Sequence, residues 1–226
     1  MNRKTWIWLG AFICFPAFSF AQTYYRVEAD FSIKESYADS LSRLTMGKVY
    51  FDKGLRKIVY KAHFPQPETL VIGDSVVQKV GADTTISSPA SPGIIDFSLF
   101  NLILSDELAD YGLGDSLYSR ASVERVDDMV ITTWKPDPVL RGLTGDVQIA
   151  RKGKLLHAVV FYSANGEVLG RQFFRKYELS AGLPFPAEII QVMKKDDVEN
   201  YIITTFSNIR FNEADTEGHY ATPLAK

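Results

Sequence analysis

The chain has 226 residues, of which 46% are hydrophobic and 13% aromatic, and its formal net charge at pH 7 is −2. This charge balance gives no reason to expect nucleic acid or an anionic membrane surface as a partner. There is one cysteine, so no intrachain disulfide framework forms, and no P-loop, dinucleotide-binding glycine motif, zinc-helix motif or nucleophile elbow occurs. We therefore expect no catalytic residue, no metal and no cofactor.

Residues 1–21 have the pattern of a cleaved secretory signal peptide. Arg3 and Lys4 give a charged start, and residues 6–18 form an apolar run too short for a typical membrane-spanning helix. Ser19-Phe20-Ala21 places small residues where cleavage before residue 22 would require them. The expected mature chain is residues 22–226, which fits a single β-rich domain.

The only cysteine, Cys14, lies inside this leader. A lipoprotein signal would carry a small residue just before the cysteine, and Ile13 stands there instead. An ordinary signal peptide is therefore the preferred interpretation, with lipidation at Cys14 kept as the alternative. The product is expected in the periplasm or outside the cell, because no later apolar run is long enough to cross a bilayer.

The region after the leader alternates between apolar and polar residues, which is typical of strands with one buried face. The apolar residues of like parity on the first three strands are Tyr25, Val27, Ala29, Phe31 and Ile33, then Val49 and Phe51, then Ile58, Tyr60, Ala62 and Phe64. A hairpin is predicted at Gly73-Asp74, between strands at 69–72 and 76–80. The breaker cluster at 87–93 is expected to end this part of the sheet.

Residues 94–104 (IIDFSLFNLIL) predict a short helix that is apolar over most of its circumference. Its polar residues Ser98, Asn101 and Ser105 fall on one narrow stripe, and Asp96 is placed to cap the first turn. A helix of this kind must be covered on most sides or must itself cover an apolar surface. In a chain that otherwise predicts strands, it is the most informative segment.

Further strands are predicted at 117–126, 129–134, 147–151, 155–162, 168–179, 187–194 and 201–211. The tail from about residue 212 is polar and is expected to be loose. About eleven strands of typical length, mostly joined by short turns, favour a mainly β (α+β) fold. We expect one large, curved antiparallel sheet or an incomplete β-barrel, with the apolar helix as a lid. One short helix covers little of so wide a sheet, so two possibilities stay open: a cavity on the concave face, or a filled core.

Polar residues do not assemble into a catalytic site on the sequence. The histidines at 63, 157 and 219 lack metal-ligand spacing, and Asp127 and Asp128 are adjacent in a turn, where acids are usually solvated. A hydrolase that uses Asp127, Asp128 or His157 is the weakest of three hypotheses, because it requires these residues to share one cleft.

An apolar ligand site is the stronger candidate. If the helix lies across the first three strands, a set of side chains converges between helix and sheet: Phe31, Ile33, Val49, Phe51, Ile58, Tyr60, Phe97, Phe100 and Leu104. The 15 phenylalanines and 11 tyrosines of the chain are enough to wall an acyl-sized pocket. They would equally serve a filled core, in which case the protein would be an interaction or envelope-sensing module that works through its convex face.

Several short motifs occur in the order found in one protein family. They are Gly47-Lys48-Val49-Tyr50-Phe51, then Lys53-Gly54 and Ile58-Val59-Tyr60, a hairpin at 70–76, the apolar helix at 94–104, and a later hairpin at 148–179. In this order the chain resembles the periplasmic lipoprotein carriers of the LolA type. The similarity covers most of the expected mature chain and rests on the order of the motifs.

The resemblance implies a curved, incomplete barrel that holds the acyl chains of lipoproteins under helical lids. It implies a non-enzymatic, monomeric periplasmic carrier of a lipidated protein or lipid-like ligand, loaded and unloaded by membrane-bound donor and acceptor proteins. In that family an Arg-Pro turn precedes the aromatic strand, and its arginine holds the lid closed. This chain has Lys53-Gly54 at that turn, with Arg56 nearby, and it lacks the family's N-terminal helix because Tyr24 and Tyr25 lead directly into a strand.

Overall fold

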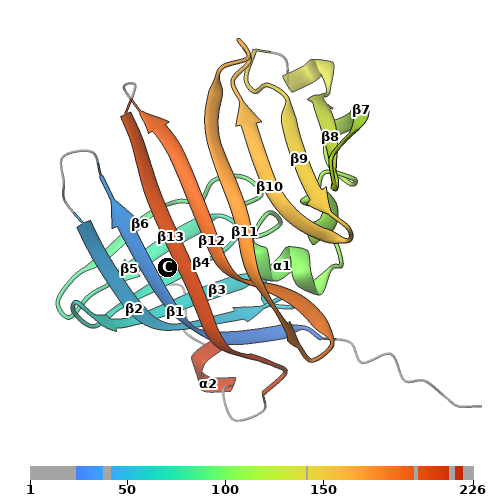
Figure 1. Ribbon diagram of the computed structural model, residues 1–226. Coiled ribbons are helices and arrows are strands. Elements are labelled where there is room, and N and C mark those ends of the chain that lie inside the picture. The colour runs from blue at the N-terminus through green and yellow to red at the C-terminus, as the bar shows by residue number, and fades with distance from the viewer. Residues whose placement is uncertain (1–23, 38–41, 141, 196–197, 214–216, 221–226) are drawn as a thin grey trace, which may run out of the picture.

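The computed structural model describes residues 24–37, 42–140, 142–195, 198–213 and 217–220. The predicted signal peptide, its cleavage site and Cys14 lie outside the described residues. In the described parts, one antiparallel sheet of thirteen strands dominates the molecule, accompanied by short helices (Figure 1). No helix among the described residues is long and apolar enough to span a membrane.

The strands follow one another along the chain with mostly short connections. The first six are β1 (Arg26–Ser36), β2 (Ser42–Asp52), β3 (Lys57–Phe64), β4 (Glu68–Ile72), β5 (Val76–Val80) and β6 (Thr85–Pro89). Helix α1 (Leu99–Leu104) and a 3-10 turn, η1 (Leu108–Asp110), come next. The remaining elements are β7 (Tyr118–Val126), β8 (Met129–Pro136), the 3-10 turn η2 (Pro138–Leu140), β9 (Val147–Lys152), β10 (Leu155–Tyr162), β11 (Val168–Ser180), β12 (Leu183–Lys195), β13 (Val198–Phe211) and helix α2 (Glu217–Tyr220).

The strand order shows that the sheet consists of two meanders. Strands β1 to β6 run outward in one direction, β13 to β7 run outward in the other, and β1 pairs with β13 at the centre. The two outer edges of the sheet, β6 and β7, are therefore consecutive strands in the chain. The segment between them has to pass from one edge of the sheet to the other.

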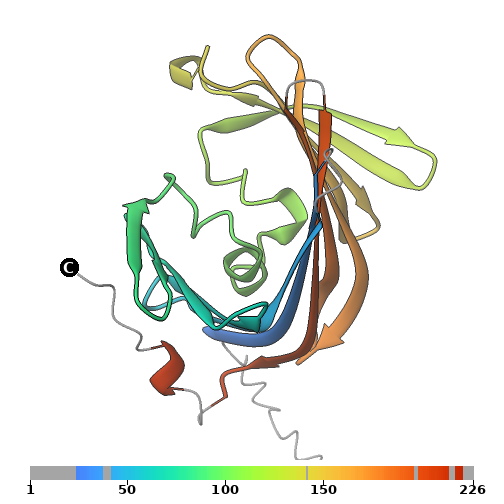
Figure 2. The same cartoon turned by 90° about the vertical axis from the view of Figure 1, so that its left-hand side faces the viewer.

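This connection, residues 90–117, carries α1 and is called the covering segment. It lies in the hollow of the curved sheet, which wraps around it (Figure 2). The apolar character of this segment follows from that position, because a helix enclosed by a sheet must be apolar on most sides. The prediction of a large, curved, open antiparallel sheet with a short apolar helix is confirmed.

Three local expectations need correction. The sheet has thirteen strands rather than about eleven, and β6 extends into the serine- and proline-rich cluster that was expected to end the sheet. Residues of β6 are exposed throughout, so this edge strand is held by its hydrogen bonds to β5 and not by a buried face. The expected loose tail is also wrong for Glu217–Tyr220, which form α2.

Helix α2 packs on the convex face of the sheet, outside β2 and β3 (Figure 2). Tyr220 is buried there in a small cluster with Tyr50, Val59 and Val71. The ring of His219 stacks on that of Tyr50 at a centroid distance of 4.7 Å. Tyr50 alternates with the concave residues Val49 and Phe51 and so lies on the convex face, where α2 covers it.

The backbones of β2 and β3 approach each other closely at Gly47, next to an irregularity in their pairing, and this approach requires glycine. A Cβ atom at Gly47 would lie 2.1 Å from the carbonyl oxygen of Lys61 and 2.7 Å from the Cα of Ala62. We expect Gly47→Ala to lower the free energy of unfolding by about 1–3 kcal/mol, because the strands must separate to admit the methyl group. Urea unfolding of the variant and the wild type checks this.

The matched control is Gly81→Ala, since a Cβ at Gly81 would be 3.7 Å from its nearest neighbour, the carbonyl oxygen of Thr84. This variant should unfold close to the wild-type midpoint. Equal midpoints for the two alanine variants would mean that the close approach of β2 and β3 tolerates a side chain.

Candidate functional site

Helix α1 is shorter than predicted and begins later. It spans Leu99–Leu104, and residues before it form turns. Its N-cap is Ser98, whose hydroxyl oxygen accepts a hydrogen bond from the backbone N–H of Asn101, so the predicted cap at Asp96 is wrong. A serine in this position satisfies one of the free N–H groups at the start of a helix.

The apolar face of α1 is anchored by Phe100. Its ring lies 5.9 Å from that of Phe51 on β2, 6.2 Å from Phe185 on β12 and 5.5 Å from Phe206 on β13. The helix therefore lies over the centre of the sheet, on both sides of the β1–β13 pairing, rather than across the first three strands alone. Phe100 is 2% exposed, so a charge at this position would mainly unfold the protein.

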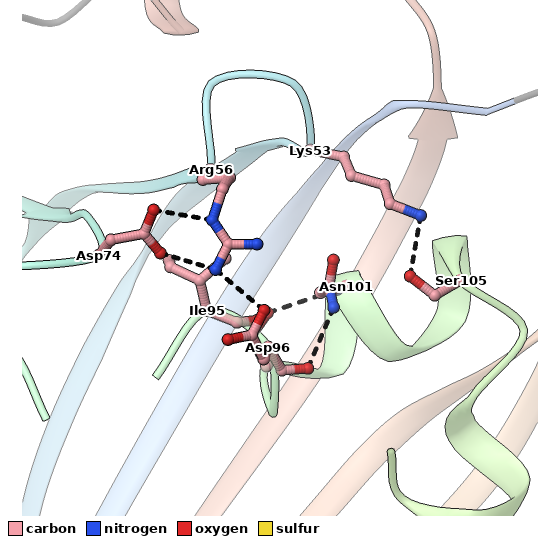
Figure 3. Close-up of polar contacts among 8 residues, drawn as sticks. Lys53, Arg56, Asp74, Ile95, Asp96, Asn101 and Ser105 are labelled. Atoms are coloured by element: carbon pink, nitrogen blue, oxygen red, sulfur yellow. Dashed lines mark hydrogen bonds and ion pairs between the residues drawn. The ribbon is translucent and has the colours of Figure 1, made fainter. Parts of the chain in front are cut away.

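The polar residues of the segment face basic side chains from the β2–β3 turn (Figure 3). Lys53 donates from Nζ to the hydroxyl of Ser105 at 2.8 Å and to the carbonyl of Leu104 at 3.4 Å. A cation at the C-terminal end of a helix is favourable, because the last carbonyl groups there carry partial negative charge.

Arg56 holds the other end of the segment. It makes a bidentate contact with Asp74 at 2.7 and 2.8 Å and donates to Asp96 at 2.9 Å (Figure 3). Hydrogen bonds to Asp74 and then Asp96 raise the pKa of Arg56 further above its usual value. Lys53 and Arg56 thus tether both ends of the apolar segment to one turn of the sheet.

A cavity of about 260 Å³ lies between this segment and the sheet. Its apolar lining comes from β3, β4, β11, β12, β13 and the covering segment: Ile58, Tyr60, Ile72, Ile94, Phe97, Leu99, Phe100, Leu102, Phe174, Ile189 and Phe206. Ser98, Tyr111, Gln172, Gln191 and Thr204 complete the lining. The concave face is therefore not completely filled, which favours the first of the two possibilities that the sequence left open.

A second, smaller cavity of about 110 Å³ lies beside the first. Tyr60 borders both, and Phe31, Ile33, Thr45, Ala62, Glu68 and Leu70 complete the second lining. The ring of Phe31 contacts that of Tyr60 edge-on, at a centroid distance of 5.1 Å. Together the two cavities follow the concave face from α1 towards β4.

The nine residues predicted from the sequence fall into two groups. Six line one or both cavities: Phe31, Ile33, Ile58, Tyr60, Phe97 and Phe100. The other three, Val49, Phe51 and Leu104, pack in the hydrophobic core and line neither cavity.

Sequence reasoning missed the wall contributed by the C-terminal half of the sheet. Phe174, Ile189 and Phe206 were placed on predicted strands, but the helix was expected only over the first three strands. The missing information was the central β1–β13 pairing, which places β13, β12 and β11 beside the first three strands in the sheet. The sequence gives no sign that three polar residues lie on the concave face: Gln172, Gln191 and Thr204. Polar residues normally mark the solvent-exposed face of a strand.

The residues of the hydrolase hypothesis lie elsewhere. Asp127 and Asp128 form the β7–β8 turn, and the carboxylate of Asp128 pairs with Lys152 at 2.5 Å. His157 is on β10, and neither cavity described above is lined by any of the three. Within the described residues, no group of three or more His, Cys, Asp or Glu side chains could hold a metal ion.

The tethers should control opening of the segment more than global stability. We expect Arg56→Gln to speed hydrogen exchange at the amides of Leu102 and Ser105 by up to about tenfold, because exposed ion pairs contribute about 0.2–1 kcal/mol each. Both amides donate within the segment, to Ser98 and Asn101. Hydrogen-exchange mass spectrometry measures the effect.

Arg171→Gln is the control, because Arg171 is equally exposed (43% against 44%) and pairs with Glu199 on the face of the sheet opposite to the cavity-lining Gln172. It should leave exchange at these amides unchanged. Equal acceleration in both variants would show that the Arg56 contacts do not hold the segment in place.

Comparison with known proteins supports the architecture. No protein-family model and no curated protein matches this chain. A LolA superfamily protein from Nitrosomonas europaea is similar in structure, with a TM-score of 0.57 and 14% identity over 86% of this chain and 88% of that one.

Two further solved structures are similar over most of their length. A putative outer membrane lipoprotein-sorting protein domain from Vibrio parahaemolyticus has a TM-score of 0.59 and 12% identity over 87% of this chain and 89% of that one. A DUF1329 family protein from Desulfovibrio piger has a TM-score of 0.58 and 12% identity over 88% and 92%. This chain therefore has the fold of the LolA superfamily and lipoprotein-sorting structures.

Proposed function

We propose that this protein is a non-enzymatic carrier or binder of an acyl chain, presented by a lipidated protein or by another lipid-like ligand. The observation that supports this most is the cavity of about 260 Å³ between α1 and the sheet, with its mostly apolar lining. Ligand sites in proteins are concave, mostly apolar and few in number. The fold shared with a lipoprotein-sorting domain points in the same direction.

The cavity is large enough to matter energetically. An apolar cavity of roughly 150 Å³ already takes up benzene, and each buried methylene of an acyl chain contributes about 0.8 kcal/mol. About ten buried methylenes would contribute about 8 kcal/mol before the cost of association is subtracted. Partial burial of one chain therefore gives useful affinity without a catalytic group.

Loading and release would require the covering segment to move. The segment is flanked by Gly93 and Gly112, both in the left-handed region at φ +73° and +69°, where a side chain would be strained. Between them the segment is held by the exposed Arg56 contacts and by Lys53. These contacts are weak enough to be broken by the differential binding of a ligand or partner.

The proposed location is the periplasm, and the proposed partners are membrane-bound proteins that deliver and accept the ligand. The leader pattern at residues 1–21 supports export, and the fold shared with the lipoprotein-sorting domain supports a role in lipid or lipoprotein traffic. We propose that the carrier acts as a monomer.

Lipid extraction and mass spectrometry of the protein purified from its native host provide the direct test. A bound acyl species should be recovered in substoichiometric to equimolar amount. The purified, delipidated protein should also bind a fluorescent polyene hydrocarbon. Failure of both measurements would rule out a carrier of acyl chains.

A charge in the cavity should block binding while leaving the core intact. Leu99 lines the cavity but is only partly buried, unlike Phe100. We expect Leu99→Glu to weaken binding of the polyene probe at least about tenfold, because an unpaired carboxylate in an apolar site is costly. Fluorescence titration measures the affinity, and circular dichroism confirms folding.

Val139→Glu is the control, since Val139 is 68% exposed on η2 and lines neither cavity. Its affinity for the probe should equal that of the wild type. A Leu99→Glu protein that stays folded and binds the probe normally would place the ligand outside this cavity.

A further inference from the structure

One part of the cavity wall is polar, which a site for plain hydrocarbon would not need. Gln172 on β11 is directly paired with Gln191 on β12, so both side chains point to the same face of the sheet. Thr204 on β13 pairs with Ile189 and is the diagonal neighbour of Gln191. These three side chains form a polar band across the apolar wall, and all three line the cavity.

Most hydrogen-bonding groups of this band have no partner among the residues that the structure describes. The carbonyl oxygen of the Gln172 side chain accepts a hydrogen bond from the hydroxyl of Tyr111 at 2.9 Å, which leaves the amide nitrogen of Gln172 as a donor. In the described part of the chain, the side chains of Gln191 and Thr204 make no hydrogen bond with another residue.

The hydroxyl of Tyr60 is a further group of this kind. It has no hydrogen-bond partner among the described residues, and its ring borders both cavities. Burial raises the pKa of Tyr60 to about 12, so the hydroxyl keeps its proton and stays a donor at neutral pH. The cavity therefore offers several donors close to an apolar floor.

The cavity has no charged lining residue to match an ionised ligand group. A carboxylate or phosphate enclosed in this cavity would lose hydration without gaining an opposite charge, which is costly. A plain hydrocarbon at the band would displace the water that satisfies the polar side chains, at a cost of about 1–3 kcal/mol for each group left without a partner. An uncharged acceptor avoids both costs.

We propose that Gln191 and Thr204, with Gln172 and Tyr60, bind the carbonyl group of an uncharged acyl ester or amide, and so select such lipids over free fatty acids and hydrocarbons. The amide group of Gln191 and the hydroxyl of Thr204 supply the two hydrogen bonds that one carbonyl oxygen can accept, and the amide group of Gln172 and the hydroxyl of Tyr60 are further donors on the same cavity wall. The apolar floor formed by Phe174, Ile189 and Phe206 takes the adjoining methylenes. This inference rests on the proposed function and adds the class of ligand.

The test compares three ligands of one chain length: a fatty acid methyl ester, the corresponding fatty acid at pH 8 and the corresponding alkane. Each displaces the fluorescent polyene hydrocarbon from the full mature protein. The ester should compete about tenfold better than the alkane, the equivalent of one well-made hydrogen bond, and also better than the acid.

Two nearly isosteric variants remove the donors without changing the shape of the wall. Gln191→Met and Thr204→Val should each weaken binding of the ester about three- to tenfold and should strengthen binding of the alkane, because a polar group that the alkane leaves without a partner is gone. Thr205→Val is the matched control, because Thr205 is the next residue on β13 and points to the convex face, where it borders a separate hollow with Ser32 and Lys48. This variant should leave competition by the ester and by the alkane as in the wild type.

The outcomes separate the two proposals. If the probe binds but the ester and the alkane compete equally, or if Thr204→Val behaves like Thr205→Val, the carbonyl site is wrong while the apolar carrier stands. If the acid competes better than the ester, the uncharged ligand class is wrong. If neither the probe nor any of the three ligands binds, the carrier function fails and this inference fails with it.

Discussion

The pairing of β1 with β13 determines where everything else in this molecule lies. It places the N-terminal and C-terminal strands at the centre of the sheet, so the sheet edges are β6 and β7, which follow each other in the chain. Because the connection between two edges of a curved sheet is shortest across its concave side, the connecting segment occupies the hollow. The position of α1 and the cavity beneath it both follow from this one pairing.

The covering segment combines two kinds of contact that differ in strength. Phe100 is fixed in a cluster of aromatic rings from β2, β12 and β13, whereas the two ends of the segment are held by single basic side chains, the partly buried Lys53 and the exposed Arg56. An anchored centre with weak ends permits local opening without global unfolding. The same segment can therefore serve both as part of the core and as a movable cover.

Much of the architecture could be predicted from the sequence, and the failures have physical causes. Alternation in β1 to β3 was visible because one face of these strands is buried, and the apolar run at 94–104 was visible because the sheet encloses it. The wall from β11 to β13 was missed because the long-range β1–β13 pairing leaves no local pattern. Helix α2 was missed because four residues have little helical propensity alone, and docking of Tyr220 on Tyr50 stabilises them.

The central strand pairing also has a consequence for how the protein is made. Asp30 and Asn208 hydrogen-bond across it although they are 178 residues apart in the chain. Contacts between such distant residues close large loops and make folding slow. The middle of the sheet cannot form until the last strand, β13, has been delivered. The first meander must therefore persist with the inner edge of β1 unpaired, at the stage when the chain is most exposed to aggregation.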